Sequence, residues 1–405
     1  MSVQTAETPG PSVLTVLAAL LAVHLAGMGA FLAVPVLAPL IGASAGLPPS
    51  LAGLHTSIVY AGTLASGPLT GTLILRYGAA RLLQMALAVI AVGLALATIG
   101  PAWALALSAL VCGVGHGPLT PAGSHILHTR APARRRSLIF GIKQTGVPAG
   151  AAIIGAAAPV LALVIGWRGA ILAVAAFGLV VVAGLQKLRR GMDAQADPRH
   201  PVSWRGALAS LRLFRDHAPL RAITIAASSF GIGQFCFSSF FVVFQVEALG
   251  YELVAAGANL ALAQVAGVVG RVGWGVVADR LAPAPVLRFL GAAIAASSMA
   301  LAVAAPSWPR EAVAAAGIAM GATAIGWNGV LLGEAARLAP PGQAGAATAM
   351  LGVVFALVML AAPSLFSLLV QTTGGYAAGF GLCAAAGLAG ALALGPPART
   401  GFTGS

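Results

Sequence analysis

Twelve long apolar runs, separated by short polar segments, are the feature that most restricts what this chain can fold into. A helix needs about 20 mostly apolar residues to cross the hydrocarbon core of a membrane. Backbone groups in lipid must be hydrogen-bonded within their own segment, so the runs are expected to be helices. The sequence therefore predicts an all-α membrane protein with twelve transmembrane helices. The predicted spans are 13–37, 51–75, 80–99, 103–127, 138–164, 168–187, 219–246, 253–277, 286–305, 311–332, 344–370 and 374–395.

The charge content excludes several classes of protein. Of the 405 residues, 59% are hydrophobic and 8% are charged, whereas a soluble domain carries about 25% charged residues. A soluble enzyme, a nucleic-acid-binding protein and a disordered chain are therefore excluded. The three cysteines lie in separate apolar runs, without the spacing of zinc ligands or of a disulfide framework. We expect no cofactor, no metal and no nucleic-acid partner, and no nucleophile–base cluster indicates an enzyme.

The positions of the 22 Lys and Arg residues predict the orientation in the membrane. If the N-terminus lies inside, only Arg168 and Arg310 fall in outer loops, and Lys143 and Arg271 fall within spans. The remaining eighteen lie in inner loops and tails. Because cytoplasmic loops carry the excess of Lys and Arg, both termini are predicted to be cytoplasmic. The predicted location is a bacterial-type inner (plasma) membrane, with the lipid bilayer as the surrounding solvent.

The two halves of the chain repeat with an offset of 204 residues, which matches Gly71 with Gly275 and Arg76 with Arg280. The longest polar stretch separates the halves, and its part at 203–217 has the apolar spacing of an amphipathic helix. We predict an N-terminal six-helix bundle at 1–188, a cytoplasmic linker at 189–218 and a C-terminal six-helix bundle at 219–405. Parallel repeats of this kind place a binding site at the interface of the bundles, near the bilayer midplane.

The turn after the second helix of each half carries a glycine- and arginine-containing motif. With this motif, the sequence resembles the major facilitator superfamily (MFS) over essentially its whole length. The family pattern is Gly, three residues, an acid, a basic residue, one residue, and Gly. The second half has the acid, Asp279, whereas the first half has Leu75 in its place. The resemblance implies the MFS fold, with 6+6 pseudo-symmetric helices, and a motif that stabilises the outward-open state. The matching residues are Gly71, Arg76, Gly78, Arg81, Gly275, Asp279 and Arg280.

Two cations lie inside predicted spans, and no Asp or Glu lies deep within any span. At the usual helical rise, Lys143 is roughly 10 Å and Arg271 roughly 12 Å from the inner end of its helix. An intramembrane cation costs at least a few kcal/mol unless it is paired or hydrated. With no buried acid to pair with, both cations are predicted to bind an anionic ligand. The alternative is that both side chains snorkel to the cytoplasmic headgroups.

Other polar residues within the spans are weaker candidates. Substrate contacts are predicted for Gln144, Gln234 and Asn328, although each could equally bond a neighbouring helix. They are also predicted for Gln264, which lies seven residues before Arg271 on the same helical face, and for Trp327, which could form a cavity wall or simply pack. The sequence from Gly270 to Asp279 resembles helix 8 of monocarboxylate and oxalate transporters, which implies that Arg271 contacts a substrate carboxylate. The sequence from Gly141 to Pro148 resembles bacterial cyanate- and organic-anion-type permeases.

A proton-coupling role is predicted for His24 and His116, because imidazole exchanges protons readily near neutral pH. A lone histidine in a membrane helix is more often a hydrogen-bond partner between helices. Taken together, the sequence predicts a monomeric secondary active transporter for a small anion, a mono- or dicarboxylate, that works by alternating access. Proton symport or anion exchange would drive it. The alternatives are an MFS exporter of neutral or lipophilic drugs and metabolites, and a non-transporting membrane sensor.

Overall fold

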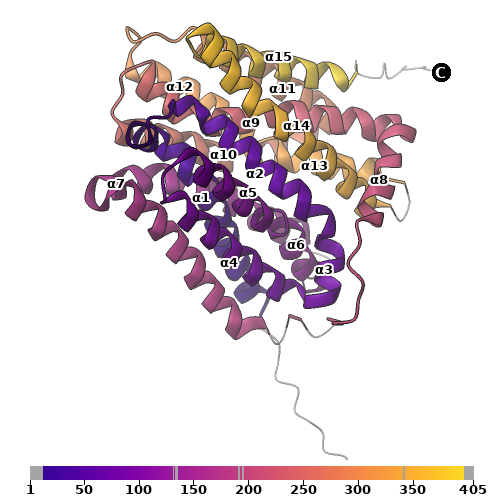
Figure 1. The fold of residues 1–405 in the computed structure, drawn as a ribbon. Coiled ribbons are helices and arrows are strands. Elements are labelled where there is room, and N and C mark those ends of the chain that lie inside the picture. Colours follow the sequence, from indigo (N-terminus) through magenta and orange to yellow (C-terminus); the bar gives the residue numbers. More distant parts are fainter. Residues whose placement is uncertain are drawn as a thin grey trace, which may run out of the picture.

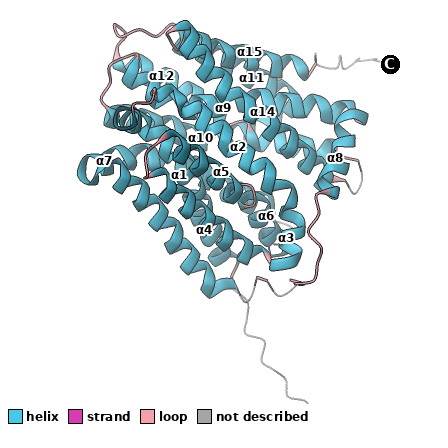
Figure 2. Cartoon of the chain, in the orientation of Figure 1, coloured by secondary structure: helices cyan, strands magenta, loops and turns pink. Residues whose placement is uncertain are grey.

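The computed structural model describes residues 12–130, 132, 136–189, 192–193, 196–340 and 343–395. Within these ranges the secondary structure is helical and contains no strand (Figure 2). The first half contains α1 (Val13–Ala45), α2 (Ala52–Ser66), α3 (Thr70–Tyr77), α4 (Ala79–Ala97), α5 (Ala102–His116), α6 (Leu119–Arg130) and α7 (Arg136–Arg189). The second half contains α8 (Arg205–Asp216), α9 (Ala218–Glu247), α10 (Leu253–Leu281), α11 (Pro283–Ala302), α12 (Arg310–Met320), α13 (Asn328–Leu338), α14 (Ala344–Thr373) and α15 (Ala377–Ala393).

Three short segments interrupt or extend these helices. Two of them are 3₁₀ turns, η1 (Pro49–Leu51) and η2 (Gly67–Leu69), and the third is a π-helical segment, η4 (Gly321–Ile325). With these segments included, ten stretches are long and apolar enough to cross a membrane. One of the ten, α7, contains two spans because Gly166, with a φ of 73°, breaks it.

The 17-residue α15 is a shorter apolar helix. Counting α7 as two spans and adding α15 gives twelve spans among the described residues. The prediction of an all-α protein with twelve transmembrane helices is therefore confirmed.

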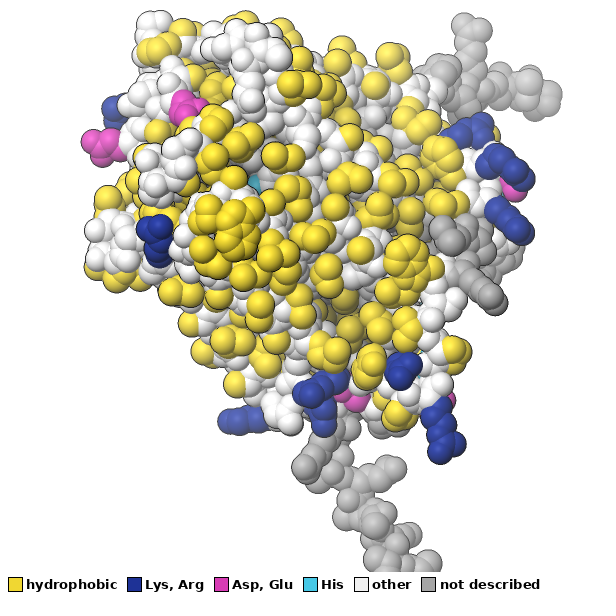
Figure 3. All heavy atoms as spheres, in the orientation of Figure 1, with side chains coloured by type: hydrophobic (Ala, Val, Ile, Leu, Met, Phe, Trp, Pro, Cys, Tyr) yellow, Lys and Arg dark blue, Asp and Glu magenta, His cyan; other side chains and the backbone are white. Residues whose placement is uncertain are grey.

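The helices form two bundles that meet along one face (Figure 1). In the first bundle α1 packs on α7, and α5 packs on α2 and α4. In the second bundle α15 packs on α9 and α11, and α14 packs on α9. The halves meet mainly where α14 lies against α2 and where α10 lies against α7. Hydrophobic side chains cover most of the face in Figure 3, and Lys and Arg gather toward the edges that carry α3 and α8. This belt is the surface that lipid would cover.

The backbone repeats the sequence symmetry at two unusual places. Gly78, which directly precedes α4, has φ 85° and ψ 151°, and Ala282, which directly precedes α11, has φ 71° and ψ 152°. These residues are 204 positions apart. The break between α5 and α6 begins at Gly117, and η4 begins at Gly321, at the same offset. The repeat therefore extends to the geometry of the turns and helix breaks.

Two ends of the bundles can be distinguished by their connections. The basic end carries the α3–α4 turn, the described residues 192–193 and 196–204, and the α10–α11 turn, and the distal end carries the α1–η1 connection and the kink at Gly166. Near the distal end, the halves are joined by hydrogen bonds between Thr56 and Ser239 at 2.8 Å and from the Ser364 amide to Ser57 Oγ at 3.0 Å. Ser367 also donates to the Ser50 carbonyl. The halves are thus in close contact at the distal end.

Glycines make this close contact possible. A Cβ at Gly53 of α2 would overlap the Pro363 carbonyl of α14 and the Phe240 ring of α9. A Cβ at Gly257 of α10 would overlap the carbonyl of Gly155 on α7. Small residues let helix backbones approach in lipid, where packing drives helix association. Both glycines therefore serve the closure of the distal end.

Candidate functional site

Lys143 lies on the first part of α7, and its side chain points into the first bundle. It is completely buried, with 0% of its surface exposed. Its Nζ donates to Ser124 Oγ at 2.8 Å and to the Thr120 carbonyl at 3.2 Å, both on α6. These bonds hold the amine within the span, so Lys143 does not snorkel to the headgroups in this structure.

Arg271 lies on α10 and reaches from the second bundle to the first. Its Nε donates to the Ile325 carbonyl at 3.0 Å, and its Nη1 donates to the Gln144 carbonyl at 2.9 Å. Gln144 follows Lys143 in α7, so the structure brings Arg271 to the residue beside Lys143. Arg271 does not snorkel either, because its guanidinium is held between the two bundles.

The π-helical segment η4 supplies acceptors to this site. A change from α- to π-helical bonding leaves carbonyls available, and such segments are frequent at functional sites. The Ile325 carbonyl accepts from Arg271, and the Ala322 carbonyl accepts from Trp274 Nε1 at 2.9 Å. A Cβ at Gly270 of α10 would overlap the Ala322 carbonyl, so glycine is required for this approach. The sequence pattern did not predict η4.

Three of the predicted polar residues belong to the same site. Asn328 Nδ2 donates to Gln234 Oε1 at 3.2 Å and to the Ile325 carbonyl at 3.3 Å, so it shares an acceptor with Arg271. The buried Trp327 ring lies 6.0 Å from Phe230 and 6.4 Å from Phe355, centroid to centroid. Its Nε1 has no hydrogen-bond partner among the described residues.

Gln144 and Gln264 have different surroundings. The backbone of Gln144 accepts from Arg271, while its side-chain Oε1 is buried without a partner in the described part of the chain. Gln264 Nε2 donates to Ser238 Oγ at 3.2 Å, which joins α10 to α9. The structure therefore gives Gln264 a helix-to-helix contact and does not bring it to Arg271.

The two histidines also have different surroundings, and one of them lies near Lys143. His24 Nδ1 donates to the Leu20 carbonyl at 2.8 Å, and its Nε2 is buried with no partner among the described residues. A Cβ at Gly123 would lie 3.5 Å from the His24 ring and 3.7 Å from Lys143 Nζ, so both groups flank this glycine. His116 lies farther along α5, against the Phe31 ring at 5.2 Å. Of the two, His24 is the neighbour of Lys143.

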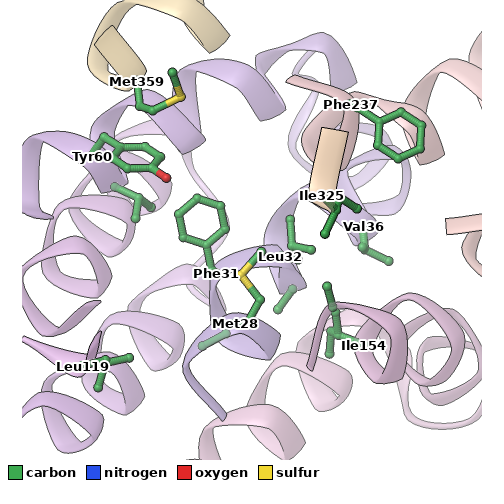
Figure 4. Close-up of a cluster of buried hydrophobic side chains, with 14 of the residues drawn as sticks. Met28, Phe31, Leu32, Val36, Tyr60, Leu119, Ile154, Phe237, Ile325 and Met359 are labelled. Atoms are coloured by element: carbon green, nitrogen blue, oxygen red, sulfur yellow. The ribbon is translucent and has the colours of Figure 1, made fainter. Parts of the chain in front are cut away.

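An aromatic cluster between the bundles was missed by the sequence analysis. Phe31 of α1 and Tyr60 of α2 lie 5.8 Å apart, and Phe235 of α9 lies 5.6 Å from Phe31 and 5.2 Å from Tyr60. Phe355 of α14 lies 5.9 Å from Phe235. Figure 4 shows Phe31 and Tyr60 with Met359 among buried side chains of both halves. The repeat could have indicated it, since Phe31 and Phe235 are 204 residues apart.

The conformational motif is arranged differently in the two halves. In the second half Asp279 and Arg280 are exposed, and no hydrogen bond or ion pair joins Asp279 to another described residue. In the first half, which has Leu75 in place of the acid, a carboxylate of the linker binds the turn after α3. The Asp193 carboxylate accepts from the amides of Ala80 at 2.8 Å and Arg81 at 3.0 Å, at the start of α4.

Asp193 is a functional candidate that the motif did not reveal. Burial raises the pKa of its carboxyl, while the amides of Ala80 and Arg81 and the charges of Arg189 and Arg81 act in the opposite direction. A Cβ at Gly78 would overlap the carboxylate, so Gly78 provides room as well as a positive φ. The Asp197 amide also donates to the Leu75 carbonyl at 2.8 Å. The linker is thus fixed to the α3–α4 turn, beside Gly71 and Arg76.

Comparison with known proteins identifies the fold. The chain resembles a bacterial homologue of the human lysosomal transporter Spinster, solved inward-facing and unoccupied, with 18% identity and a TM-score of 0.72 over 96% of this chain and 93% of that one. A peptide transporter of the POT type, solved as a mutant in complex with sulfate, has 16% identity and a TM-score of 0.76 over 94% of this chain and 93% of that one. No curated protein sequence matches significantly.

The Major Facilitator Superfamily model matches residues 19–362, which is most of the sequence. This match agrees with the repeat, the motif turns and the two bundles. The chain is therefore a transporter-type, multi-pass membrane protein that belongs to the major facilitator superfamily.

Proposed function

We propose that the protein is a secondary active transporter of a small anion, most readily a mono- or dicarboxylate. The observation that carries this proposal is Arg271, a cation within a membrane span whose described contacts are all neutral carbonyls. A charge at this depth is costly unless it has a partner. A carboxylate can accept two parallel N–H bonds from one guanidinium, which makes an anionic substrate the natural partner.

Lys143 and the polar chain through Asn328 and Gln234 complete the proposed site. Lys143 is the residue before Gln144 in α7 and adds an amine to the guanidinium of Arg271. Asn328 donates to the Ile325 carbonyl, which also accepts from Arg271. Because Arg271 bonds both bundles, an anion that replaces one of these bonds would alter the contact between them. Such a change is what alternating access requires of a substrate.

We infer that the basic end faces the cytoplasm and that the structure corresponds to an inward-facing state. The excess of Lys and Arg supports the orientation. The close contacts at Gly53 and Gly257 support closure at the distal end. Asp279, exposed and without a partner among the described residues, is consistent with a motif that engages only in the outward-open state. A protein of a bacterial-type inner membrane, monomeric and with both termini inside, fits this arrangement.

The test is uptake of radiolabelled lactate and oxalate into proteoliposomes, together with thermal shifts of the purified protein by the same anions. Arg271→Gln is expected to lower uptake at least about tenfold, because a hydrogen bond to a charged group contributes about 1.5–3 kcal/mol. The matched control is Arg215→Gln, since Arg215 is exposed on α8 and its ion pair among the described residues is with the exposed Asp216. Equal uptake by wild type and Arg271→Gln would remove the basis for an anion site.

The aromatic cluster favours one alternative, an exporter of neutral or lipophilic compounds. Stacked rings between the bundles, such as Phe235 and Phe355, could contact an apolar cargo. That function predicts thermal stabilisation by neutral aromatic compounds that persists in Arg271→Gln. Stabilisation by anions that is lost in Arg271→Gln supports the anion transporter instead.

A further inference from the structure

The hydrogen bonds of Lys143 match an amine in its neutral form. A neutral amine carries two N–H groups and one lone pair, whereas an ammonium carries three N–H donors and no acceptor. The described protein atoms offer Nζ two acceptors, Ser124 Oγ and the Thr120 carbonyl. Both acceptors are uncharged, and the side chain has no exposed surface.

The groups around Lys143 do not favour a fixed positive charge. His24 of α1 lies near Lys143, and Ser124 and Thr120 of α6 accept its hydrogen bonds. From the second bundle, Arg271 reaches the carbonyl of Gln144, the residue next to Lys143. On its own helix, the Phe140 ring lies 5.8 Å from Nζ, and this cation–π contact is the one described neighbour that favours the ammonium. The buried acid of the described spans, Glu334, is bonded to Arg337 at 2.6 and 2.7 Å and is not a partner of Lys143. An unpaired ammonium in such surroundings carries a large desolvation cost.

Arg271 differs from Lys143 in a way that divides their roles. A guanidinium keeps its proton in proteins, so Arg271 offers a permanent charge, whereas a buried lysine changes its protonation readily. Arg271 is half-buried between the bundles, and Lys143 is enclosed within one of them. One site therefore contains a permanent cation and, one residue away along α7, a group that can gain or lose a proton.

We propose that Lys143 is the site of the coupling proton, which makes the transporter a proton symporter rather than an exchanger. This inference rests on the proposed function. In the empty site Lys143 is a neutral amine. When an anion enters, the Nζ lone pair takes a proton from a hydronium ion: an O–H bond of hydronium breaks to leave water, an N–H bond forms, and the ammonium pairs with the anion beside Arg271. On release the N–H bond breaks, and the proton leaves with the anion to the same side.

This mechanism removes the need for a buried carboxylate and changes the role predicted for the histidines. His24 and Lys143 both lie beside Gly123, which has no side chain, so His24 can relay the proton to Lys143 through its unpartnered Nε2. A monocarboxylate and one proton move together, so the cycle carries no net charge against the membrane potential, whereas a dicarboxylate moved with one proton carries one negative charge.

The first experiment counts protons taken up on binding. Calorimetry of lactate and oxalate binding in two buffers of different ionisation enthalpy gives the protons bound per anion. Wild type is expected to take up about one proton per anion at a pH where the empty site is neutral. Lys143→Arg, which is permanently charged, is expected to take up none. Lys187→Arg, at an exposed position on the same helix α7, is the matched control and is expected to behave as wild type.

The second experiment measures coupling in proteoliposomes, with Arg271→Gln vesicles as the background. For one proton per monovalent anion, a gradient of about one pH unit sustains about a tenfold lactate accumulation in wild type. Lys143→Arg is expected to exchange lactate more slowly than wild type and to show no accumulation driven by the proton gradient. Thermal unfolding confirms that each variant is folded, and Lys143→Met provides a second, uncharged variant of similar length.

Several results would overturn the assignment of the proton to Lys143. Gradient-driven accumulation or proton uptake that persists in Lys143→Arg would place the proton elsewhere. Lactate exchange by wild type that ignores the proton gradient would refute symport while leaving the anion transporter intact. A wild-type protein that neither binds nor carries either anion would refute the proposed function itself.

Discussion

Ala282 occupies a backbone conformation that only glycine adopts without strain. With φ 71° and ψ 152°, this residue at the start of α11 stands where the first half has Gly78. Such a conformation costs a non-glycine residue about 1–3 kcal/mol. Replacing alanine by glycine also increases the entropy of the unfolded chain, which costs about 0.4–1 kcal/mol. Ala282→Gly is therefore expected to stabilise the protein by a net of about 0.5–2 kcal/mol.

Thermal unfolding in one detergent, at matched protein concentration, tests this prediction against two control variants. Gly78→Ala places the same strain in the first half and adds an overlap with Asp193, so it should lower stability by at least about 1–3 kcal/mol. Ala292→Gly, at an exposed position within α11, should cost about 0.5–1 kcal/mol, as expected inside an ordinary helix. If Ala282→Gly lowered the unfolding temperature as Ala292→Gly does, the strain at Ala282 would not be real.

Three further predictions concern the contacts between the moving parts. Asp193→Asn should weaken the attachment of the linker to α4 and speed amide hydrogen exchange at Ala80 and Arg81, whereas the exposed Asp216→Asn should leave that exchange unchanged. Gly53→Val should prevent closure of the distal end and lower transport with little effect on anion affinity, because its side chain would overlap Pro363; unchanged transport would contradict this. Asp279→Asn should change the transport rate more than the substrate affinity, and a change in affinity alone would argue against its role as a conformational motif.

The architecture could be predicted from the sequence because a chain in lipid must satisfy its backbone hydrogen bonds within each span. The length of each apolar run defines a span, and the helix break at Gly166 lies between two predicted spans, 138–164 and 168–187. The helical interruptions inside spans were not predicted. Pro68 and Pro118 lack the N–H that a continuous helix needs, so α2 and α5 end near them. Their positions were visible in the sequence, but prolines inside membrane helices often cause no break.

The candidate site was predicted in part, for a different physical reason. Charge in an apolar run is conspicuous, so Lys143 and Arg271 could be selected from the sequence alone. Their partners could not be selected, because they are backbone carbonyls and small hydroxyl groups such as Ser124, which are common in any membrane helix. Asp193 was missed because the groups that donate hydrogen bonds to its carboxylate are backbone amides 112 and 113 residues away in the chain. Its role depends on tertiary structure and has no local sequence signal.

The two halves share a backbone pattern but have different side chains at equivalent positions of the repeat. Helix breaks at Gly117 and Gly321 lie at the same repeat position, yet only the second forms η4 and offers a carbonyl to Arg271. Arg271 itself corresponds to Gly67 in the first half, and Lys143 corresponds to Ala347 in the second. Each cation is thus present in one half only, and the hydrogen bond from Arg271 to the Gln144 carbonyl brings Arg271 to the residue next to Lys143. If the protein binds an anion as proposed, a rocking motion of the bundles would change the distance between Arg271 and the first bundle, and with it the affinity for an anion that needs both cations.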